Sequence, residues 1–498
     1  MTATPAAPPV GSFALVLHTH LPWLPHAGTW PVGEEWLYQA FTGSWRRVVG
    51  VVERLAAEGR RDVLTLGVTP VVAAMLDDPY SLGELHTWAG NWQLRAQLAA
   101  QHPHLRDLAA HEWREATACL ADLEDRWLRG GSAVLRPLVD SGAVELLGGP
   151  ATHPFQPLLH GRVQRFALRT GLDDARVRFG RAPAGIWAPE CGYAPGLEAS
   201  YADAGVRRFL VDGPTLHGDT AAAHPVGDSG VLAFGRDLDV TYRVWSPKAG
   251  YPGDGAYRDF HTFDHPTGFR PARVTGKQVA SWDKAPWDPV RAADAVDRHA
   301  DDFVQTVVAR LADLRDRDGR PGLVVAAYDT ELFGHWWYEG PQWLEAVLRR
   351  LPEAGVRVTT LAGAVEAGHV GAPRELPASS WGSGKDWRVW DGEQVADLVE
   401  ESRQVQDRLV QLVDKLGGPF RDPVLDQLAR EALLVTSSDW AFMVTKDSAA
   451  GYARRRAAEH TARFHRLADL VESGGGAAEA AHLRLIDGPF GHLDSRLL

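Results

Sequence analysis

Two carboxylates follow short apolar runs that are typical of buried strands, and tryptophans stand close to both. Asp329 comes after the run Leu323 to Ala327, and Glu190 comes after the run that ends at Trp187. An acid beside indole rings suits a sugar, whose C–H faces pack on aromatics while its hydroxyls need polar partners. Two such carboxylates can cleave a glycosidic bond as nucleophile and general acid/base when they lie about 5 Å apart.

The two carboxylates need different roles. We assign the nucleophile role to Glu190, because Pro189 restricts the backbone where the strand ends, and the acid/base role to Asp329. The acid must start protonated and the nucleophile ionised, so their surroundings must separate the two pKa values. A simpler interpretation stays open for each of them, since a carboxylate at a strand end often only caps the next helix.

Three histidines are expected near these carboxylates. His18 and His20 form an H-x-H at the end of the first predicted strand, and His153 follows the third. Side chains at i and i+2 share one face of a strand, so the pair could hold a metal ion in a hydrolase that acts on amides. We favour hydrogen bonds from the three imidazoles to sugar hydroxyls. A structural role for each histidine, bonded to a loop, also stays open.

Tryptophans in loops are the expected sugar platforms. Trp30, Trp381 and Trp390 stand in segments rich in Gly or Pro, where burial in a core is less expected. The Trp-Trp pair that follows Asp329 is expected to support that carboxylate instead. Asp439 lies in a Ser-Ser-Asp-Trp segment that indicates a helix N-cap, and it can contact substrate only if that helix start points at the site.

The elements that must position these residues alternate between strand and helix. Polar residues stand at the carboxyl end of most predicted strands, which favours a parallel (β/α) barrel, since a barrel gathers all strand ends on one face. A doubly wound sheet would gather only the residues near its switch point. The predicted strands are 13–17, 62–68, 144–147, 184–187, 208–211, 323–327 and 356–360.

Segments too long for barrel loops interrupt this series. We expect a barrel over 12–77 and 141–372, an inserted helical subdomain over 78–140, and a helical C-terminal domain over 373–498. The C-terminal helices are predicted over 394–415, 423–435 and 439–472. Residues 231–287, rich in Gly, Pro and aromatics and including Tyr251, are expected to form a functional loop over the site.

The composition excludes several partners. A formal net charge of −12 argues against nucleic acid or an anionic membrane as the main partner, because both need a basic face. The sequence contains no apolar run long enough for a membrane span, its first ten residues do not read as a signal peptide, and its 2 cysteines give no disulfide framework. We therefore expect a cytoplasmic protein with a neutral substrate.

Five ordered segments resemble the motifs of glycoside hydrolase family 57, and in particular its 1,4-α-glucan branching enzymes. The resemblance covers nearly the whole chain, and its third and fourth segments are long enough to make coincidence implausible. The segments are His18-Thr-His-Leu-Pro22, Ala151-Thr-His-Pro154, Gly185-Ile-Trp-Ala-Pro-Glu-Cys-Gly-Tyr193, Tyr328-Asp-Thr-Glu-Leu-Phe-Gly-His-Trp-Trp-Tyr-Glu-Gly-Pro341 and Ser437-Ser-Asp-Trp440.

This resemblance implies an α/β fold, an incomplete (β/α)7 TIM-like barrel with an inserted helical subdomain and a helical C-terminal domain. It implies Glu190 as nucleophile, Asp329 as acid/base and no metal or other cofactor. Tyr251 resembles a loop-tip tyrosine that favours transfer over hydrolysis. The residues expected to bind substrate are His18, His20, Trp30, His153, Tyr251, Trp381, Trp390 and Asp439.

The activity implied is retaining transfer of an α-1,4-glucan segment, from a chain such as amylose or a glycogen-like polysaccharide, to a 6-hydroxyl. An α-amylase or a 4-α-glucanotransferase of the same family is the nearest alternative. From other classes, a metal-dependent amidohydrolase-like enzyme and a non-catalytic glycan-binding protein stay open.

Overall fold

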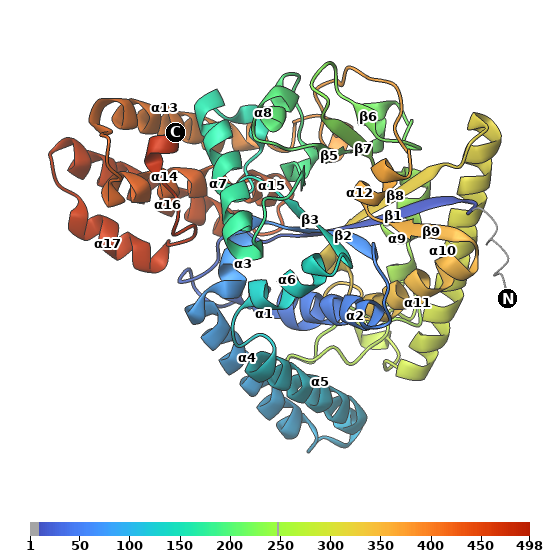
Figure 1. The fold of residues 1–498 in the computed structure, drawn as a ribbon. Coiled ribbons are helices and arrows are strands. Elements are labelled where there is room, and N and C mark those ends of the chain that lie inside the picture. Colours follow the sequence, from blue (N-terminus) through green and yellow to red (C-terminus); the bar gives the residue numbers. More distant parts are fainter. Residues whose placement is uncertain (1–8, 247–248) are drawn as a thin grey trace.

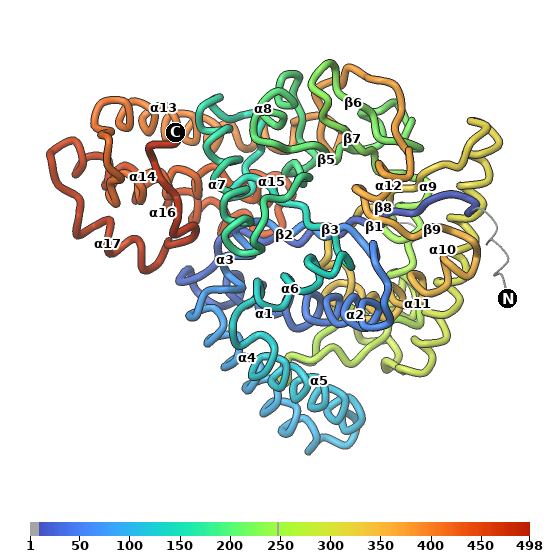
Figure 2. Tube along the Cα trace, in the orientation of Figure 1, coloured from blue at the N-terminus to red at the C-terminus, as the bar shows by residue number. Residues whose placement is uncertain are grey.

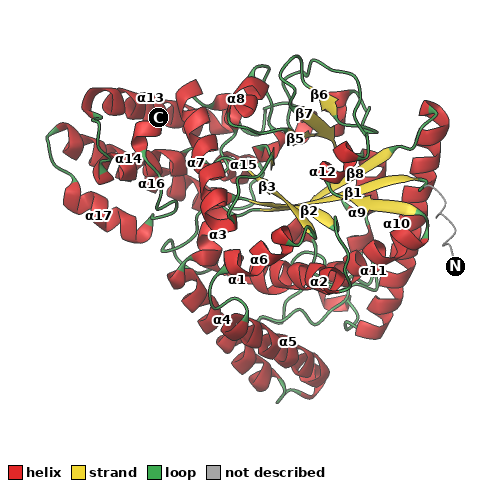
Figure 3. Cartoon of the chain, in the orientation of Figure 1, coloured by secondary structure: helices red, strands yellow, loops and turns green. Residues whose placement is uncertain are grey.

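The computed structural model describes residues 9–246 and 249–498, and a curled sheet of parallel strands with helices packed around it lies at its centre (Figures 1 and 3). The parallel strands follow the spatial order β7-β5-β4-β3-β2-β1-β8, and β6 pairs antiparallel with β7. The strand bounds are β1 Gly11–Thr19, β2 Leu64–Val68, β3 Val144–Gly148, β4 Gly185–Ile186, β5 Arg208–Val211, β6 His224–Pro225, β7 Leu232–Gly235, β8 Leu323–Asp329 and β9 Val356–Thr359.

The two end strands, β7 and β8, come together without forming a ladder. Asp237, just after β7, donates its backbone N–H to the carbonyl of Val325 in β8 at 2.9 Å, and Leu323 N–H donates to the carbonyl of Ala221 at 3.1 Å. Across the described ranges, no strand register joins β7 to β8. The barrel is therefore not fully closed, which confirms the predicted incomplete (β/α)7 architecture.

The sequence prediction of the strands misses β7. It puts Leu232–Gly235 inside a loop, whereas this segment is β7 and pairs in parallel with β5. Four residues between Gly- and Pro-rich stretches are too short a run for periodicity to detect. The last predicted strand, 356–360, is confirmed as β9, which pairs with Gly11–Ala14 at the start of β1, next to the half of β1 that pairs with β2.

Helices cover the outside of the barrel, as the strand-helix alternation predicts. Small and branched side chains from successive strands fill the interior, so the barrel has a packed core below its carboxyl-end face. The barrel helices are α1 Glu34–Ala40, α2 Arg46–Ala57, α3 Pro70–Asp77, α6 Gly131–Asp140, α7 Gly161–Phe179, α8 Leu197–Asp203, α9 Leu238–Val244, α10 Pro289–Asp318, α11 Gly340–Glu353 and α12 Leu361–Glu366.

The inserted subdomain is a helical hairpin. α4 (Pro79–Ala99) and α5 (Arg106–Asp125) pack along each other and project from the barrel between α3 and α6 (Figures 1 and 2). α6 packs against α2, α3 and α7. We therefore propose that the insert ends before Gly131, earlier than the limit of 140 expected from the sequence.

The C-terminal helices gather on one side of the barrel (orange to red in Figure 1). They surround α14, in which every residue from Leu425 to Val435 is buried. The single helix predicted over 439–472 is wrong: it divides after Thr445, and Asp447 at the break has a left-handed backbone (φ 49°). The helices are α13 Ala396–Leu416, α14 Pro423–Val435, α15 Ser438–Thr445, α16 Ala450–Glu472 and α17 Ala477–Ile486.

Among the helices formed by residues 9–246 and 249–498, none combines the length and the apolar character that crossing a bilayer requires.

Candidate active site

Glu190 lies in a tight turn directly after β4. Pro189–Cys191 form a single 3₁₀ turn in which Glu190 and Cys191 both have left-handed backbones, with φ of 61° and 49°. Such a conformation costs a non-glycine residue about 1–3 kcal/mol and persists only where the surroundings fix it. Here Trp381 donates its backbone N–H to the carbonyl of Glu190 at 2.9 Å. The turn therefore holds the Glu190 side chain at the carboxyl end of the barrel.

Both carboxylate oxygens of Glu190 accept hydrogen bonds from residues far along the chain. Ser438 Oγ donates to Oε1 at 2.7 Å, and Trp381 Nε1 donates to Oε2 at 2.8 Å. Two donors favour the ionised form of a carboxylate and fix its orientation. This arrangement suits a nucleophile.

Asp329 is the last residue of β8, where the sequence predicts it. Its register partner in β1 is His18, whose ring stacks on Trp187 with 4.3 Å between ring centres. Trp187 lies just before the Glu190 turn, so this stack links the two strand ends. Within the part of the chain that the structure describes, the Asp329 carboxyl has no hydrogen-bond donor. An acid without a fixed partner can approach the oxygen of a leaving group.

Burial raises the pKa of both carboxyls, to about 7 for Glu190 and about 6 for Asp329. The hydrogen bonds from Ser438 and Trp381 oppose the rise at Glu190, and the positive charge of Arg236 opposes it at Asp329. This pKa order alone would make Glu190 the acid. The two hydrogen bonds fix the orientation of the Glu190 carboxylate, whereas Asp329 has no donor among the described residues, and this difference in geometry is the stronger guide to the two roles.

A third carboxyl, that of Glu331, lies next to Asp329. Burial and then the negative charge of Asp329 raise the pKa of Glu331 to about 8. Its Oε1 accepts a hydrogen bond from Trp45 Nε1 at 2.6 Å. Near neutral pH Glu331 is therefore mostly protonated, and it adds little negative charge beside Asp329.

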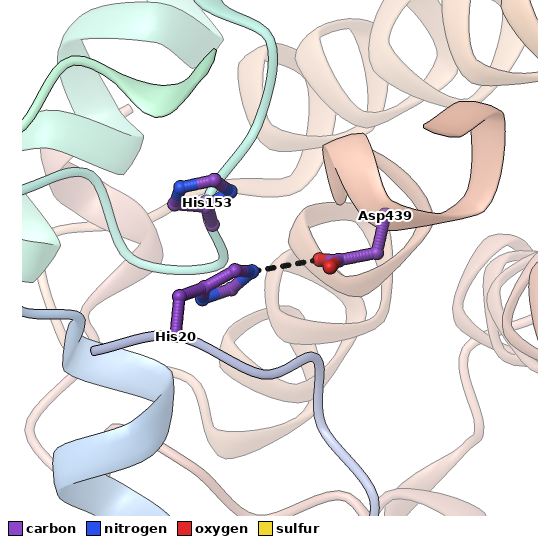
Figure 4. Close-up of side chains that lie close together, drawn as sticks. All are labelled: His20, His153 and Asp439. Carbon is purple, nitrogen blue, oxygen red and sulfur yellow. Dashed lines mark hydrogen bonds and ion pairs between the residues drawn. The ribbon is translucent and has the colours of Figure 1, made fainter. Parts of the chain in front are cut away.

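The three predicted histidines come together, as the barrel requires. The rings of His20 and His153 stack with 3.6 Å between their centres, and Asp439 lies beside His20 (Figure 4). His18 Nε2 and His153 Nε2 share a hydrogen bond of 3.1 Å. Burial first, then the charge of neighbouring histidines, lowers the pKa of both His18 and His153 far below the usual value, so these two rings are neutral.

His20, His153 and Asp439 lie close enough to hold a metal ion, since their ligand atoms are all within 4.8 Å of one another. Every ring nitrogen of the two histidines, however, already has a protein partner. His20 bonds to Thr69 at 3.1 Å and Asp439 at 2.9 Å, and His153 bonds to Ser438 at 2.9 Å as well as to His18. The rings of His20 and His153 are also nearly parallel, with 19° between their planes. The nitrogen lone pairs lie in the ring planes, so those of the two rings do not converge on one ion. The geometry favours a hydrogen-bonded cluster over a metal site.

Arg236 brings positive charge to the Asp329 side of the site. Its guanidinium pairs with buried Asp212 at 2.9 Å and lies 5.4 Å from the centre of the Trp381 ring. Lys385 Nζ contacts the other oxygen of Asp212 at 2.5 Å. Asp212, also at a strand end, is therefore neutralised by two cations and is not a candidate acid.

The three tryptophans expected as sugar platforms differ in their exposure. Trp381 is partly exposed and bonds to Glu190, and Trp30 is 76% exposed in the loop after β1. Trp390 is only 1% exposed and stacks flat on Phe155, with 4.7 Å between ring centres. The prediction of an exposed platform is wrong for Trp390, because a ring from the β3 loop covers it. Its role in this structure is packing.

Tyr251 also differs from the expectation. It is not at an exposed loop tip: its side chain is 6% exposed, its ring stacks on His299 with 4.5 Å between centres, and its hydroxyl donates to Asp302 of α10. The ring also lies against Trp343 of α11, with 6.1 Å between ring centres, so it is not available to substrate in this conformation. Residues 247–248 of the predicted loop lie outside the described residues.

The start of α15 points at the site. Ser437 occupies the N-cap position without a capping side-chain bond, while Ser438 bonds to Glu190 and Asp439 to His20. Burial acts to raise the pKa of the Asp439 carboxyl. The charge and the hydrogen bond of His20 outweigh burial and lower this pKa to about 2. The simple N-cap interpretation of Asp439 is therefore wrong.

Sequence reasoning missed Ser438 and Arg236 as members of the site. Ser438 lies inside a segment already singled out, but its partner Glu190 is 248 positions away. Arg236 directly follows β7, the strand that the sequence did not reveal. Recognition of β7 would have placed Arg236 at a strand end beside the predicted site residues.

Comparisons with known proteins agree with this architecture. The model of glycosyl hydrolase family 57 matches residues 125–375, and the model of the 1,4-alpha-glucan branching enzyme C-terminal domain matches residues 401–497. A probable 1,4-alpha-glucan branching enzyme of Mycobacterium tuberculosis is 55% identical over 99% of both chains.

Solved structures show the same fold. A family 57 branching enzyme of Thermococcus kodakaraensis superposes with a TM-score of 0.93 at 31% identity, over 98% of this chain and 96% of that one. An α-amylase of Thermotoga maritima superposes with a TM-score of 0.87 at 25% identity, over 98% of both chains. With a family model over half of the sequence and a relative aligned along its whole length, the chain belongs to glycosyl hydrolase family 57.

Proposed function

We propose that this protein is a 1,4-α-glucan branching enzyme, which cuts an α-1,4-glucan chain and transfers the cut segment to a 6-hydroxyl. The observation that carries the proposal is the hydrogen bond from Ser438 to Glu190. Ser438 lies in the segment matched by the branching-enzyme C-terminal model, and its hydroxyl donates a hydrogen bond to a carboxylate at the end of a barrel strand. The identity of 55% to a probable branching enzyme along the whole chain supports the same activity.

The proposed reaction has two steps. The Glu190 carboxylate attacks the anomeric carbon while Asp329 gives its proton to the departing glycosidic oxygen, which leaves a glycosyl group covalently bound to Glu190. Asp329, now ionised, then takes the proton from the 6-hydroxyl of an acceptor glucan, whose oxygen attacks the same carbon and releases Glu190. Two inversions give net retention of the α configuration.

The other site residues have supporting roles in this proposal. Ser438 and Trp381 fix the orientation of the Glu190 carboxylate and oppose the rise of its pKa. His18, His20, His153 and Asp439 form the hydrogen-bonding floor for sugar hydroxyls, and Trp381 with Trp30 supplies aromatic surface. The proposed substrate is a neutral α-glucan such as amylose or a glycogen-like polysaccharide. A cytoplasmic location is part of the proposal and is supported by two buried free cysteines, Cys119 and Cys191.

The test is incubation with amylose, followed by counts of new α-1,6 linkages and of new reducing ends. A branching enzyme gives α-1,6 linkages in excess of reducing ends, and Glu190→Gln abolishes both. Reducing ends without branches would instead indicate an amylase, the activity named for the Thermotoga maritima structure. New α-1,4 chain lengths without branches would indicate a 4-α-glucanotransferase.

A further inference from the structure

A pocket of about 130 Å³ lies between the barrel and the inserted hairpin, and the proposed mechanism does not use it. Its walls come from α1 and the π-helical segment Phe41–Trp45, from both hairpin helices α4 and α5, from the loop 258–270 and from the turn 334–338 that follows Asp329. Its lining includes neither Glu190 nor Asp329.

Aromatic rings form much of this pocket and are partly exposed. Trp336 is 39% exposed and Phe263 is 43% exposed, and Trp245 packs edge-on against Trp336 with 5.7 Å between ring centres. The expectation that both tryptophans after Asp329 only support the carboxylate is therefore wrong for Trp336. The second of the pair, Trp337, is 1% exposed and does pack in the core.

Two arginines in the pocket, Arg270 and Arg95, form no side-chain hydrogen bond or ion pair with another residue that the structure describes. Arg270 lies between Phe260 and Phe263, 4.3 and 4.7 Å from their ring centres, and its buried Nε has no acceptor within the described ranges. Arg95 lies over Trp88 at 5.6 Å, also without an ion pair to any described residue. Guanidinium groups between rings, with free N–H donors, can bond to adjacent sugar hydroxyls while the rings contact C–H faces.

The charges in the pocket favour a neutral ligand. Four arginines and four carboxylates line it, so it has no formal excess of either sign. Buried Glu112 pairs with Arg258, and Asp259 pairs with Lys284 at 2.8 Å. An uncharged molecule rich in hydroxyls can satisfy the free donors without disturbing this balance, whereas a phosphate would add charge next to four acids.

The pocket is connected to the acid/base side of the site. Ser44 Oγ donates to the carbonyl of Thr330 at 2.7 Å, so the π-helical wall is fixed to the residue after Asp329. Gly43 and Gly334 pack so closely that a Cβ on Gly334 would lie 1.9 Å from the Gly43 carbonyl oxygen. In a retaining transfer, the leaving chain departs and the acceptor arrives on the side of the acid/base.

We propose that this pocket binds the acceptor glucan, with Trp336 and Phe263 as platforms and Arg270 and Arg95 as donors to its hydroxyls. The inference rests on the proposed branching function. It assigns to the inserted hairpin, through Arg95 and Trp88, a part in holding the chain that receives the branch.

The experiment compares Trp336→Ala with the parent enzyme on amylose and measures branches made per glycosidic bond cleaved. The expected result is a fall in that ratio of roughly three- to tenfold, the effect of losing one aromatic platform, while cleavage stays within about twofold. Arg270→Gln should act in the same direction. The matched control is Trp113→Ala, which removes a tryptophan of nearly equal exposure (40%) on α5 that does not line the pocket.

Three outcomes would overturn the proposal. In the first, the ratio is unchanged in Trp336→Ala while the parent branches normally, which rejects the acceptor pocket and leaves the branching function intact. In the second, millimolar glucose 6-phosphate blocks transfer in the parent but not in Trp336→Ala, which means that the pocket takes an anionic sugar. In the third, the parent releases reducing ends and makes no branches, which rejects both proposals.

Discussion

Trp381 holds Glu190 twice, across 191 positions of sequence, through its indole N–H to the carboxylate at 2.8 Å and its backbone N–H to the Glu190 carbonyl at 2.9 Å. The first bond orients the carboxylate, and the second fixes a turn with an unfavourable backbone. The segment after the barrel therefore takes part in holding the turn that follows β4.

The roles of the two carboxylates can be separated by chemical rescue with azide. We expect Glu190→Gly and Asp329→Gly each to lower the turnover of an activated α-glucoside, by at least about a hundredfold. Azide should restore product formation in both variants. With Glu190→Gly the glucosyl azide should have the inverted β configuration, since only one displacement occurs, and with Asp329→Gly it should keep the α configuration. Anomeric proton NMR distinguishes the two, and the reverse pattern would exchange the roles.

Ser438→Ala should lower kcat/KM below pH 7 and move the alkaline side of the pH profile to higher pH, because the proposed nucleophile Glu190 (pKa about 7) titrates above the proposed acid Asp329 (pKa about 6). The hydrogen bond from Ser438 lowers the pKa of Glu190, which is about 7 in the parent protein. Loss of this bond raises the pKa of Glu190 further, so a smaller fraction of the nucleophile is ionised at each pH below 7. The measurement is kcat/KM for a soluble glucan between pH 5 and pH 9. Ser438→Thr, which keeps a hydroxyl, is the matched control and should restore the parent profile. A loss of activity of equal size at pH 5 and at pH 9 would contradict this account.

Sequence was informative where the information is local. β8 and Asp329 follow from one apolar run that ends at a carboxylate, and α14 follows from an amphipathic pattern with Pro423 at its first turn. Burial of Trp390 could not be predicted, because Phe155, which covers it, lies in another segment of the chain. Ser438 was hidden for the same reason. Contacts that join distant segments depend on how the barrel and the helices pack, and neither periodicity nor spacing records that packing.

Trp390→Ala should act on stability more than on substrate binding. Removing a tryptophan that is 1% exposed and stacked on Phe155 leaves a cavity, so we expect a loss of about 3–5 kcal/mol and a lower Tm by differential scanning calorimetry. KM for amylose should stay near the parent value at temperatures where the variant is folded. Trp381→Ala is the comparison, with the opposite balance of a small Tm change and a large activity loss. A Trp390→Ala protein with parental Tm and raised KM would restore the platform role.

Removal of metal should leave the activity unchanged. The ring nitrogens of His20 and His153 are all hydrogen bonded to protein, so no ion is needed to hold the cluster. The measurement is branching activity and Tm after dialysis against EDTA, compared with a mock-dialysed sample. The metal-dependent amidohydrolase alternative requires the activity to disappear with EDTA and to return with a divalent cation.

Glu331→Gln should make the protein more stable at alkaline pH. Burial and the charge of Asp329 raise the pKa of Glu331 from its ordinary 4.5 to about 8, so between these values the folded protein binds a proton that the unfolded chain releases. Stability from this group is therefore present below pH 4.5 and is lost as pH rises toward 8. Gln does not ionise, and the variant should gain up to about 4 kcal/mol over the parent at pH 9 but little at pH 5. The test is Tm measured across pH 5–9 for the parent and for Glu331→Gln, with a substitution at an exposed position, Glu353→Gln, as the control. Parallel Tm curves for Glu331→Gln and the parent would show that Glu331 ionises normally in the folded protein.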